Sequence, residues 1–428
     1  MAHELASGRA ATLIKLGFAA LAKVSSAFAA FALTAIVTRN LSADDAGLFL
    51  LGFTLVTVFA VVVRLGLDNV VLRFLSAEGP TPFAQDKLNR GLVWVASLAI
   101  PVTIMAMAAS QVIATYVFNK PDFGPVLFWL LPALPCIAVF TVLSFGFQSQ
   151  HRVILTTFFQ TLGVSALFVL AVLGIWYWAP AELTTLTLAK VYSASAAVVL
   201  VLALGLWFLQ NGVQFRVTEF RDPELKRAAM HLWVAALMSL SVQWSGVLIS
   251  GALLPAADVA LFSAALRTAM LTSFVLMVVN MVVAPRYARL WKEGNIQRIR
   301  YLAKWSARGM VVLVAPVIAV MMIWPEFVMG LFGDGYDDAA ILLMVLAVGQ
   351  FINVATGSVG FLLNMSGHER DFNRVTLFSG PLTIVLAVSL TMQWGVLGTA
   401  IATALGVALQ NLGAAWMVKR RLGFVPLL

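Results

Sequence analysis

The residues best able to do chemistry are basic side chains within long apolar runs. Four residues fit this description: Lys23, Arg64, Lys190 and Arg267. No carboxylate lies near the middle of any of these runs, and the nearest one, Asp68, follows Arg64 by four positions. Lysine and arginine pair with phosphate oxygens through charge-assisted hydrogen bonds. The pattern therefore predicts a binding site for an anionic, phosphorylated ligand.

Each of these bases also has a structural interpretation. Arg64 and Asp68 have the spacing at which opposite charges pair on one helix face, and Arg64 can also extend toward the water surface. Lys23 lies deepest in its apolar run and shares a polar stripe with Ser26 and Thr34. Ionisable groups at such a depth usually face a cavity or a partner. Lys23 is therefore the first candidate for a ligand contact.

Uncharged polar residues form two further stripes, whose spacing of three, four or seven residues keeps each stripe on one helix face. The stripes consist of Ser239, Gln243 and Ser250, and of Asn353, Thr356, Gly360 and Asn364. Gln243 and Asn353 are the candidates for hydrogen bonds to hydroxyl groups of a ligand. Small and polar residues also hold membrane helices together, and for any single residue that packing role is the simpler interpretation.

Several kinds of site are not supported by the sequence. Cys136 is the only cysteine, so no internal disulfide can form, and the four histidines are scattered far apart. No cluster with zinc-ligand spacing and no phosphate-binding GxxxxGK[ST] loop occurs. We therefore expect neither a metal nor a cofactor.

The composition sets the fold class. Of the 428 residues, 61% are hydrophobic and 11% charged, whereas soluble domains carry roughly 25% charged residues. A helix of about 20 apolar residues spans a bilayer. The hydrophobic runs predict an all-α polytopic membrane protein with about 12 transmembrane helices. These are residues 11–38, 46–66, 91–116, 124–148, 153–178, 183–209, 228–253, 258–284, 304–324, 338–363, 374–393 and 395–418.

Charged residues predict the orientation of these spans. Lysine and arginine are concentrated in alternate loops and in the C-terminal tail, and both termini are then cytoplasmic by the positive-inside rule. The same bias explains the net charge of +9 without nucleic acid. A polar linker at 211–227 separates an N-terminal lobe, residues 1–210, from a C-terminal lobe, residues 228–428.

The two halves show signs of an internal duplication. Asp45 and Arg73 match Asp258 and Arg286 at one constant offset. Six spans per repeat bring both repeats into the membrane in the same orientation. Two six-helix lobes would then be related by a pseudo-two-fold axis along the membrane normal, with a cavity between them. This arrangement predicts alternating access by rocking of the lobes.

Three segments carry a family resemblance. Residues 38–76, from TRNLSADDAG to VVLRFLS, resemble the opening of the Wzx-type oligosaccharide flippases. These flippases belong to the multidrug/oligosaccharidyl-lipid/polysaccharide (MOP) exporter superfamily. Residues 331–370, which contain LFGDGYDD, and 394–411, WGVLGTAIATALGVALQN, resemble the second half of the same family. The resemblance spans nearly the whole chain, although its motifs indicate a superfamily better than a substrate.

The resemblance implies a flippase rather than an enzyme. Its cargo would be polyprenyl-pyrophosphate-linked oligosaccharide repeat units for lipopolysaccharide O-antigen, capsule or exopolysaccharide. It would act in the bacterial inner membrane beside a polysaccharide polymerase or chain-length regulator. The alternative is a cation-coupled multidrug exporter of the same superfamily, which usually depends on a buried carboxylate that the first span here lacks. A membrane glycosyltransferase is disfavoured because the outer loops are short, and the acidic GDGYDD segment matches a family loop.

Overall fold

The computed structural model describes residues 2–78, 81–150, 152–211 and 223–425, with side chains described from Leu21 onward apart from short stretches near 76–84 and 223–235. Within these ranges the chain forms helices and no strand. A backbone in lipid must satisfy its hydrogen bonds internally, which a helix does. Most of the expected linker, residues 212–222, lies outside the described part of the chain.

The expected set of membrane spans is confirmed, with one qualification. Eleven helical segments in the described residues are long and apolar enough to cross a bilayer. The last of them, Glu369–Leu422, has 54 residues and contains non-helical backbone at Trp394 and Gly395. It is therefore two membrane-length helices joined by a tight reversal, and this brings the total of described spans to twelve.

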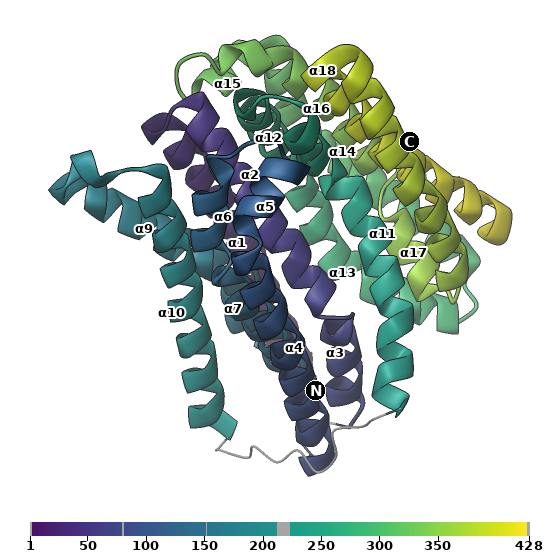
Figure 1. The fold of residues 1–428 in the computed structure, drawn as a ribbon. Helices are drawn as coiled ribbons and strands as arrows, with labels where there is room; N and C mark the ends of the chain where they lie inside the picture. The colour runs from purple at the N-terminus through teal and green to yellow at the C-terminus, as the bar shows by residue number, and fades with distance from the viewer. Residues whose placement is uncertain (1, 79–80, 151, 212–222, 426–428) are drawn as a thin grey trace. The chain divides into compact units, whose positions relative to one another are not determined.

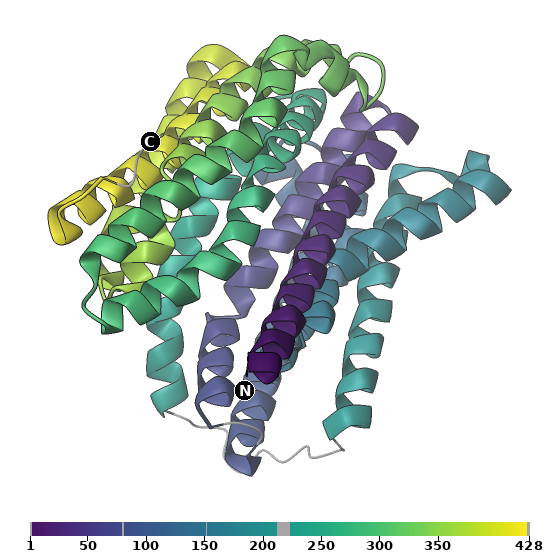
Figure 2. The ribbon, with the colours of Figure 1, turned by 180° about the vertical axis from the view of Figure 1, so that it is seen from behind.

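The chain divides into two compact units, each containing three segments of sequence. Unit 1 comprises residues 1–36, 55–116 and 120–234, and unit 2 comprises residues 37–54, 117–119 and 235–428. Three helices, α1 (Ala2–Asn40), α2 (Ala43–Val63) and α11 (Pro223–Leu253), contribute residues to both units. Figure 2 shows α1 as one continuous rod.

Unit 1 is built around α7, which packs against α3, α4 and α10, while α10 also packs against α6 and α9 (Figure 1). Besides parts of the shared helices, its elements are α3 (Leu67–Glu78), α4 (Pro82–Ala108), α5 (Ser110–Val112), α6 (Phe123–Leu130), α7 (Ala133–Ser149), α8 (Val153–Thr157), α9 (Gly163–Trp178) and α10 (Thr185–Asn211). Short turns of other helix types occur at η1 (Ile113–Val117), η2 (Phe158–Leu162) and η3 (Pro180–Glu182).

Unit 2 is built around α16, which packs against α12, α14 and α18, while α13 packs against α14 and α17. Its elements are α12 (Ala256–Met270), α13 (Thr272–Lys292), α14 (Ile296–Ile323), α15 (Pro325–Gly330), η4 (Asp337–Ala339), α16 (Ala340–Ala355), α17 (Val359–Met365) and α18 (Glu369–Leu422). Two pairs of consecutive helices in unit 2 are separated by very short segments. Leu271 alone lies between α12 and α13, and residues 356–358 lie between α16 and α17.

Local sequence determines several helix ends. Ser42 Oγ accepts a hydrogen bond from the Asp45 N–H at 3.2 Å and so caps the start of α2, where acidic residues also suit the helix dipole. Asn295 Oδ1 accepts from the Arg298 N–H at 3.1 Å and caps α14. At the other end of the chain, α18 stops at Gly423, which adopts a left-handed conformation with φ of 74°.

The second span ends earlier than its hydropathy predicts. The sequence suggests a helix to residue 66, but α2 ends at Val63 and a separate helix, α3, begins at Leu67. Leu65 and Gly66 between them have positive φ values of 53° and 74°, which a right-handed helix cannot accommodate. At the break, the Val62 carbonyl oxygen accepts two hydrogen bonds, one from the Leu65 N–H at 3.2 Å and one from the Trp233 indole N–H at 2.9 Å.

Residues 37–54 are tied to the C-terminal helices inside unit 2. Arg39 Nε donates to the Leu331 carbonyl oxygen at 2.9 Å. Asp44 Oδ1 accepts from the Ala257 N–H at 3.0 Å, at the N-terminal end of α12, where the helix dipole favours a carboxylate. Polar contacts therefore join the end of α1 to the end of α15, and the start of α2 to the start of α12.

An ion pair joins the first turn of α18, at Asp371, to its last turn, at Arg421. Arg421 Nε lies 2.6 Å from Asp371 Oδ2, and Arg421 Nη2 donates to Asp371 Oδ1 at 3.1 Å. Asp371 is 4% exposed and has a second basic neighbour, Arg374, at 3.4 Å. A two-point contact of this kind holds both groups in a defined geometry.

Replacing Arg421 with alanine should therefore lower the melting temperature of the purified protein. The reason is that the buried Asp371 carboxylate would keep only the longer contact to Arg374, and an underpaired buried charge destabilises the folded state. Arg420→Ala is the matched control, because Arg420 is exposed and lies over the Trp416 ring at 5.6 Å. Equal melting temperatures for the two variants, measured by intrinsic fluorescence, would contradict this role of Arg421.

Candidate functional site

The main candidate site is a partly open cavity of about 380 Å³ lined by residues of unit 2. This volume falls in the range of roughly 300–1,000 Å³ that is usual for small-molecule sites. Six helices contribute to its walls: α11, α12, α13, α16, α17 and α18. Its polar lining is uncharged and consists of Ser239, Gln243, Ser273, Asn280, Gln350, Asn353, Ser358, Thr403, Gln410 and Asn411.

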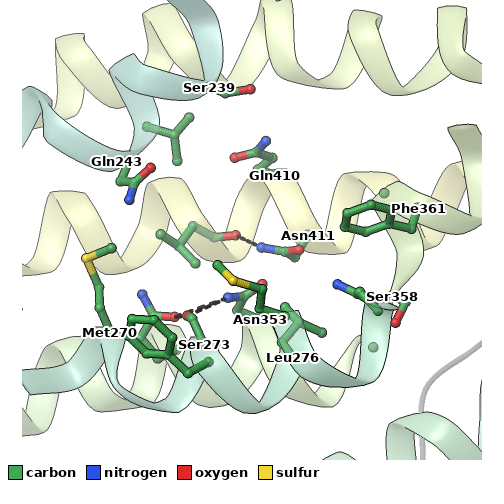
Figure 3. Close-up of a pocket in the computed structure, with 18 of the residues that line it drawn as sticks. Ser239, Gln243, Met270, Ser273, Leu276, Asn353, Ser358, Phe361, Gln410 and Asn411 are labelled. Carbon is green, nitrogen blue, oxygen red and sulfur yellow. Dashed lines mark hydrogen bonds between the residues drawn. The ribbon is translucent and has the colours of Figure 1, made fainter. Parts of the chain in front are cut away.

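Three of these side chains form a hydrogen-bonded network on one wall. Ser273 Oγ donates to Gln350 Oε1 at 2.8 Å, and Asn353 Nδ2 donates to the same oxygen at 3.1 Å. Asn353 Nδ2 is also 3.4 Å from Ser273 Oγ. The network fixes the orientation of the Gln350 amide, and Figure 3 shows Ser273 and Asn353 facing the same space as Gln243 and Gln410.

Two polar atoms in the lining have no such partner. Asn280 is 7% exposed and Ser358 is 6% exposed, and neither Asn280 Oδ1 nor Ser358 Oγ makes a hydrogen bond within the described residues. Buried polar groups are nearly always hydrogen-bonded, so each exception requires an explanation. These two atoms therefore identify places in the cavity where a ligand group or solvent is needed.

The remaining walls are apolar. Phe274, Phe361 and Phe372 line the cavity together with Met270 and Met277. Phe361 is 45% exposed, and Figure 3 shows it on the same side of the space as Ser358. The site thus combines neutral hydrogen-bonding groups with aromatic faces, the mixture that fixes orientation and shape in many ligand sites.

The structure brings together the two candidates for hydrogen bonds to the ligand, and with them Ser239 and Gly360 from the same two polar stripes. Gln243 on α11 and Asn353 on α16 both line the cavity, although they are far apart in the chain. Sequence analysis missed most of the other polar lining residues. A signal did exist for two of them, because Ser273 and Asn280 are seven residues apart and so share one face of α13.

The four embedded bases do not line this cavity. Lys23 lies on α1 in unit 1, half-buried, and no acidic side chain pairs with it among the described residues. Arg64 lies between α2 and α3, where its Nε is 3.6 Å from Asp68 Oδ2, so the pairing that the spacing predicts is present. Asp68 offsets the charge of Arg64, although the buried Arg64 Nε makes no hydrogen bond within the described residues.

The other two bases lie against aromatic rings. Lys190 on α10 is exposed, and its Nζ is 4.7 Å from the centre of the Trp129 ring in unit 1. Arg267 lies in the last turn of α12, with its guanidinium carbon 4.3 Å from the centre of the Phe53 ring in unit 2. Contacts of this type stabilise a cation near a membrane interface or in a partly desolvated position.

Comparison with known families agrees with this architecture. The sequence model of the family described as "Polysaccharide biosynthesis protein" matches residues 13–291, about two thirds of the chain. The chain belongs to this family. The model of the MatE family also matches, over residues 233–389. The membership of the MOP superfamily that the sequence suggests is thereby confirmed.

Two curated archaeal relatives are similar over part of their length. A probable low-salt glycan biosynthesis flippase of Haloferax volcanii is 26% identical over 233 residues, which cover 52% of this chain and 47% of the relative. An uncharacterized membrane protein of Methanocaldococcus jannaschii is 22% identical over 160 residues, 37% of this chain and 31% of the relative. The chain thus spans half or less of the length of these relatives.

Solved structures are similar in fold to this chain over nearly its whole length. An inward-facing multidrug resistance MATE family transporter of the MOP superfamily matches with a TM-score of 0.75 and 15% identity, over 94% of this chain and 98% of that one. A MOP superfamily transporter from Pyrococcus furiosus, described as having a binding pocket of reverse polarity, matches with a TM-score of 0.69 and 14% identity, over 96% and 95%. At these identities the similarity shows the two-lobe transporter fold alone.

Proposed function

We propose that this transporter moves a polyprenyl-pyrophosphate-linked oligosaccharide from the cytoplasmic to the outer leaflet of a bacterial inner membrane. Its lobes alternate in access to the two sides, and both termini are cytoplasmic. Embedded bases hold the anionic head group, while neutral polar residues such as Gln243 and Asn353 contact the saccharide. The product supplies surface polysaccharide assembly, with a polymerase or chain-length regulator as the next component.

The observation that carries this proposal is the sign of the charge at Lys23. A half-buried lysine with no described acidic partner, in a helix of a membrane transporter, is costly unless an anion pairs with it. A pyrophosphate supplies such an anion, and lysine binds phosphate as a compact point charge. Family membership supports a cargo from polysaccharide biosynthesis, in agreement with this charge.

The other bases differ in how much they add to the proposal. Arg267 is the second candidate for a head-group contact, since no acid precedes or follows it closely in sequence. Arg64 pairs with Asp68, and Lys190 lies exposed against Trp129, so each of them already has a described partner. The test of the proposal therefore rests on Lys23.

A cation-coupled multidrug exporter is the second candidate. The MatE match over residues 233–389 and the similarity in fold to a multidrug transporter favour it. A cationic drug, however, is best bound by a carboxylate, and the cavity lining described above contains none. Efflux of a cationic dye such as ethidium separates the two candidates directly.

The test begins with deletion of the gene in the source cells, followed by extraction of lipid-linked saccharides and assay of surface polysaccharide. We expect lipid-linked repeat units to accumulate and surface polymer to be lost. Expression of the wild-type gene should reverse both effects, and Lys23→Ala should restore less than a tenth of the polymer. Lys292→Ala, which removes an exposed base at the end of α13, is the matched control and should restore it fully.

Two results would reject the proposal. One is normal polymer and no accumulated carrier lipid in the deletion strain, together with a loss of ethidium efflux, which would establish the exporter. The other is full rescue by Lys23→Ala at wild-type protein level, which would remove Lys23 from cargo binding.

A further inference from the structure

We propose that the cavity of unit 2 binds the uncharged saccharide part of the cargo, with Asn280 and Ser358 as its anchoring contacts. The site would be separate from any group that holds the pyrophosphate. The inference rests on the proposed function for the identity of the cargo. The chemistry of the ligand, a neutral ring that carries several hydroxyl groups, follows from the cavity itself.

The two unpartnered atoms define what the ligand must offer. Asn280 Oδ1 can only accept a hydrogen bond, while Ser358 Oγ can both donate and accept. A buried acceptor without a donor has lost its hydrogen bond to water without gaining another, which is destabilising. A sugar hydroxyl is a donor and an acceptor at once, so one molecule with several hydroxyls satisfies both atoms.

The rest of the lining selects against an ion. The amide groups of Gln243, Gln410 and Asn411 supply both donors and acceptors, and no lining residue described is charged. An ionised phosphate or ammonium group would lose its hydration there without gaining a counter-charge, which is costly. A neutral polar ligand does not incur this cost.

The aromatic walls suit the apolar faces of a sugar ring. A pyranose ring presents C–H groups on its faces and hydroxyls around its edge. Phe361 on α17 and Phe372 on α18 line the cavity, and Figure 3 shows Phe361 near Ser358. The partially positive C–H groups are attracted to the negative face of an aromatic ring. A ring stacked there would direct its hydroxyl edge toward the polar side chains.

The backbone adds a separate observation. One helix break meets the cavity, because Gly357 and Ser358 lie in the interruption between α16 and α17. Ser273 lies two residues after Leu271, where the hydrogen bonding changes locally but the backbone angles stay right-handed helical. Gly357 has a φ of 73°, which ends α16 in a left-handed conformation. Non-helical backbone at membrane depth is tolerated where it borders a cavity or pore, and interrupted helices often mark the substrate site of a transporter.

The experiment measures binding of a free saccharide to the purified full-length protein in nanodiscs. The probe is the oligosaccharide released by mild acid hydrolysis from the lipid fraction of the source cells, and affinity is measured by calorimetry. Asn280→Leu, which keeps the side-chain size, and Ser358→Ala should each weaken binding tenfold or more. Asn364→Leu is the matched control, because Asn364 is exposed on α17 and does not line the cavity, and it should bind as the wild type does.

A second ligand separates the saccharide site from the head-group site and checks folding. Farnesyl pyrophosphate carries the phosphates and a short isoprenoid but no sugar. Asn280→Leu and Ser358→Ala should bind it with unchanged affinity, which also shows that these variants are folded. Lys23→Ala should weaken this binding and leave that of the saccharide unchanged.

Saccharide affinity that is absent in the wild type, or equal in wild type, Asn280→Leu and Ser358→Ala, would overturn the inference. An equal loss of farnesyl pyrophosphate binding in the two cavity variants would overturn it as well, because the cavity would then not be selective for the sugar. These outcomes are distinct from failure of the proposed function. That failure is seen in the deletion strain, where no lipid-linked saccharide would accumulate whatever the cavity binds.

Discussion

Gly47→Ala should strongly destabilise the protein, although alanine is the better helix former. A Cβ atom at residue 47 would overlap the carbonyl oxygen of Ala256, where α2 meets α12 inside unit 2. A backbone carbonyl cannot swing aside as a flexible side chain can, so the helices must separate. Overpacking of this kind costs about 1–3 kcal/mol, more than the roughly 1 kcal/mol that alanine gains in helix propensity.

The measurement is the melting temperature of the purified protein, together with the yield of monodisperse material. Gly205→Ala is the matched control, because Gly205 is exposed on α10 and a Cβ there meets nothing within 4 Å. We expect the control to be as stable as the wild type or more so. If Gly47→Ala melted at the temperature of Gly205→Ala, the close approach of α2 and α12 would be wrong. The contact matters because it helps to hold residues 37–54 in unit 2.

Gly395→Ala should destabilise the protein by a different route. Gly395 has a φ of 58° and a ψ of −139°, at the point where α18 reverses direction. Residues with a side chain pay of order 1–3 kcal/mol for such a conformation. A Cβ at this position meets nothing within 4 Å, so the loss would come from backbone strain alone.

The reversal at Gly395 brings Thr391 Oγ1 to 2.8 Å from Thr399 Oγ1, and strain that opened it would separate this pair. The melting temperature of Gly395→Ala should fall relative to Gly309→Ala, a substitution inside α14 that also meets nothing within 4 Å. Unchanged stability would indicate that the last two spans are joined by a different turn.

Several features of the fold could be predicted from sequence because they depend on short stretches of chain. The apolar runs predict the membrane class and the twelve spans, and the spacing of Arg64 and Asp68 predicts their ion pair. The breaks inside the spans were not predictable in the same way. Hydropathy continues smoothly through Leu65 and Leu271. The interruption at Leu65 is visible only in its positive φ, and the one at Leu271, whose backbone angles stay helical, only in a local change of hydrogen bonding.

The candidate site was predictable only in part. Gln243 and Asn353 belong to polar stripes that a single helix reveals, and both line the cavity. Gln410 was missed, although it follows Thr403, another lining residue, by seven positions and so shares one face of α18 with it. Its place in the lining depends on how α18 packs against the other helices.

By itself, the sequence of this protein determined its class, its spans and its resemblance to a transporter superfamily. The class and the spans follow from composition over about twenty residues, the length that crosses a bilayer, and the resemblance follows from local motifs such as those at 38–76 and 331–370. Only the tertiary structure decided that the neutral amides, and not the bases, share a cavity. That grouping brings side chains from six helices together, and helix packing is set by contacts between residues far apart in the chain.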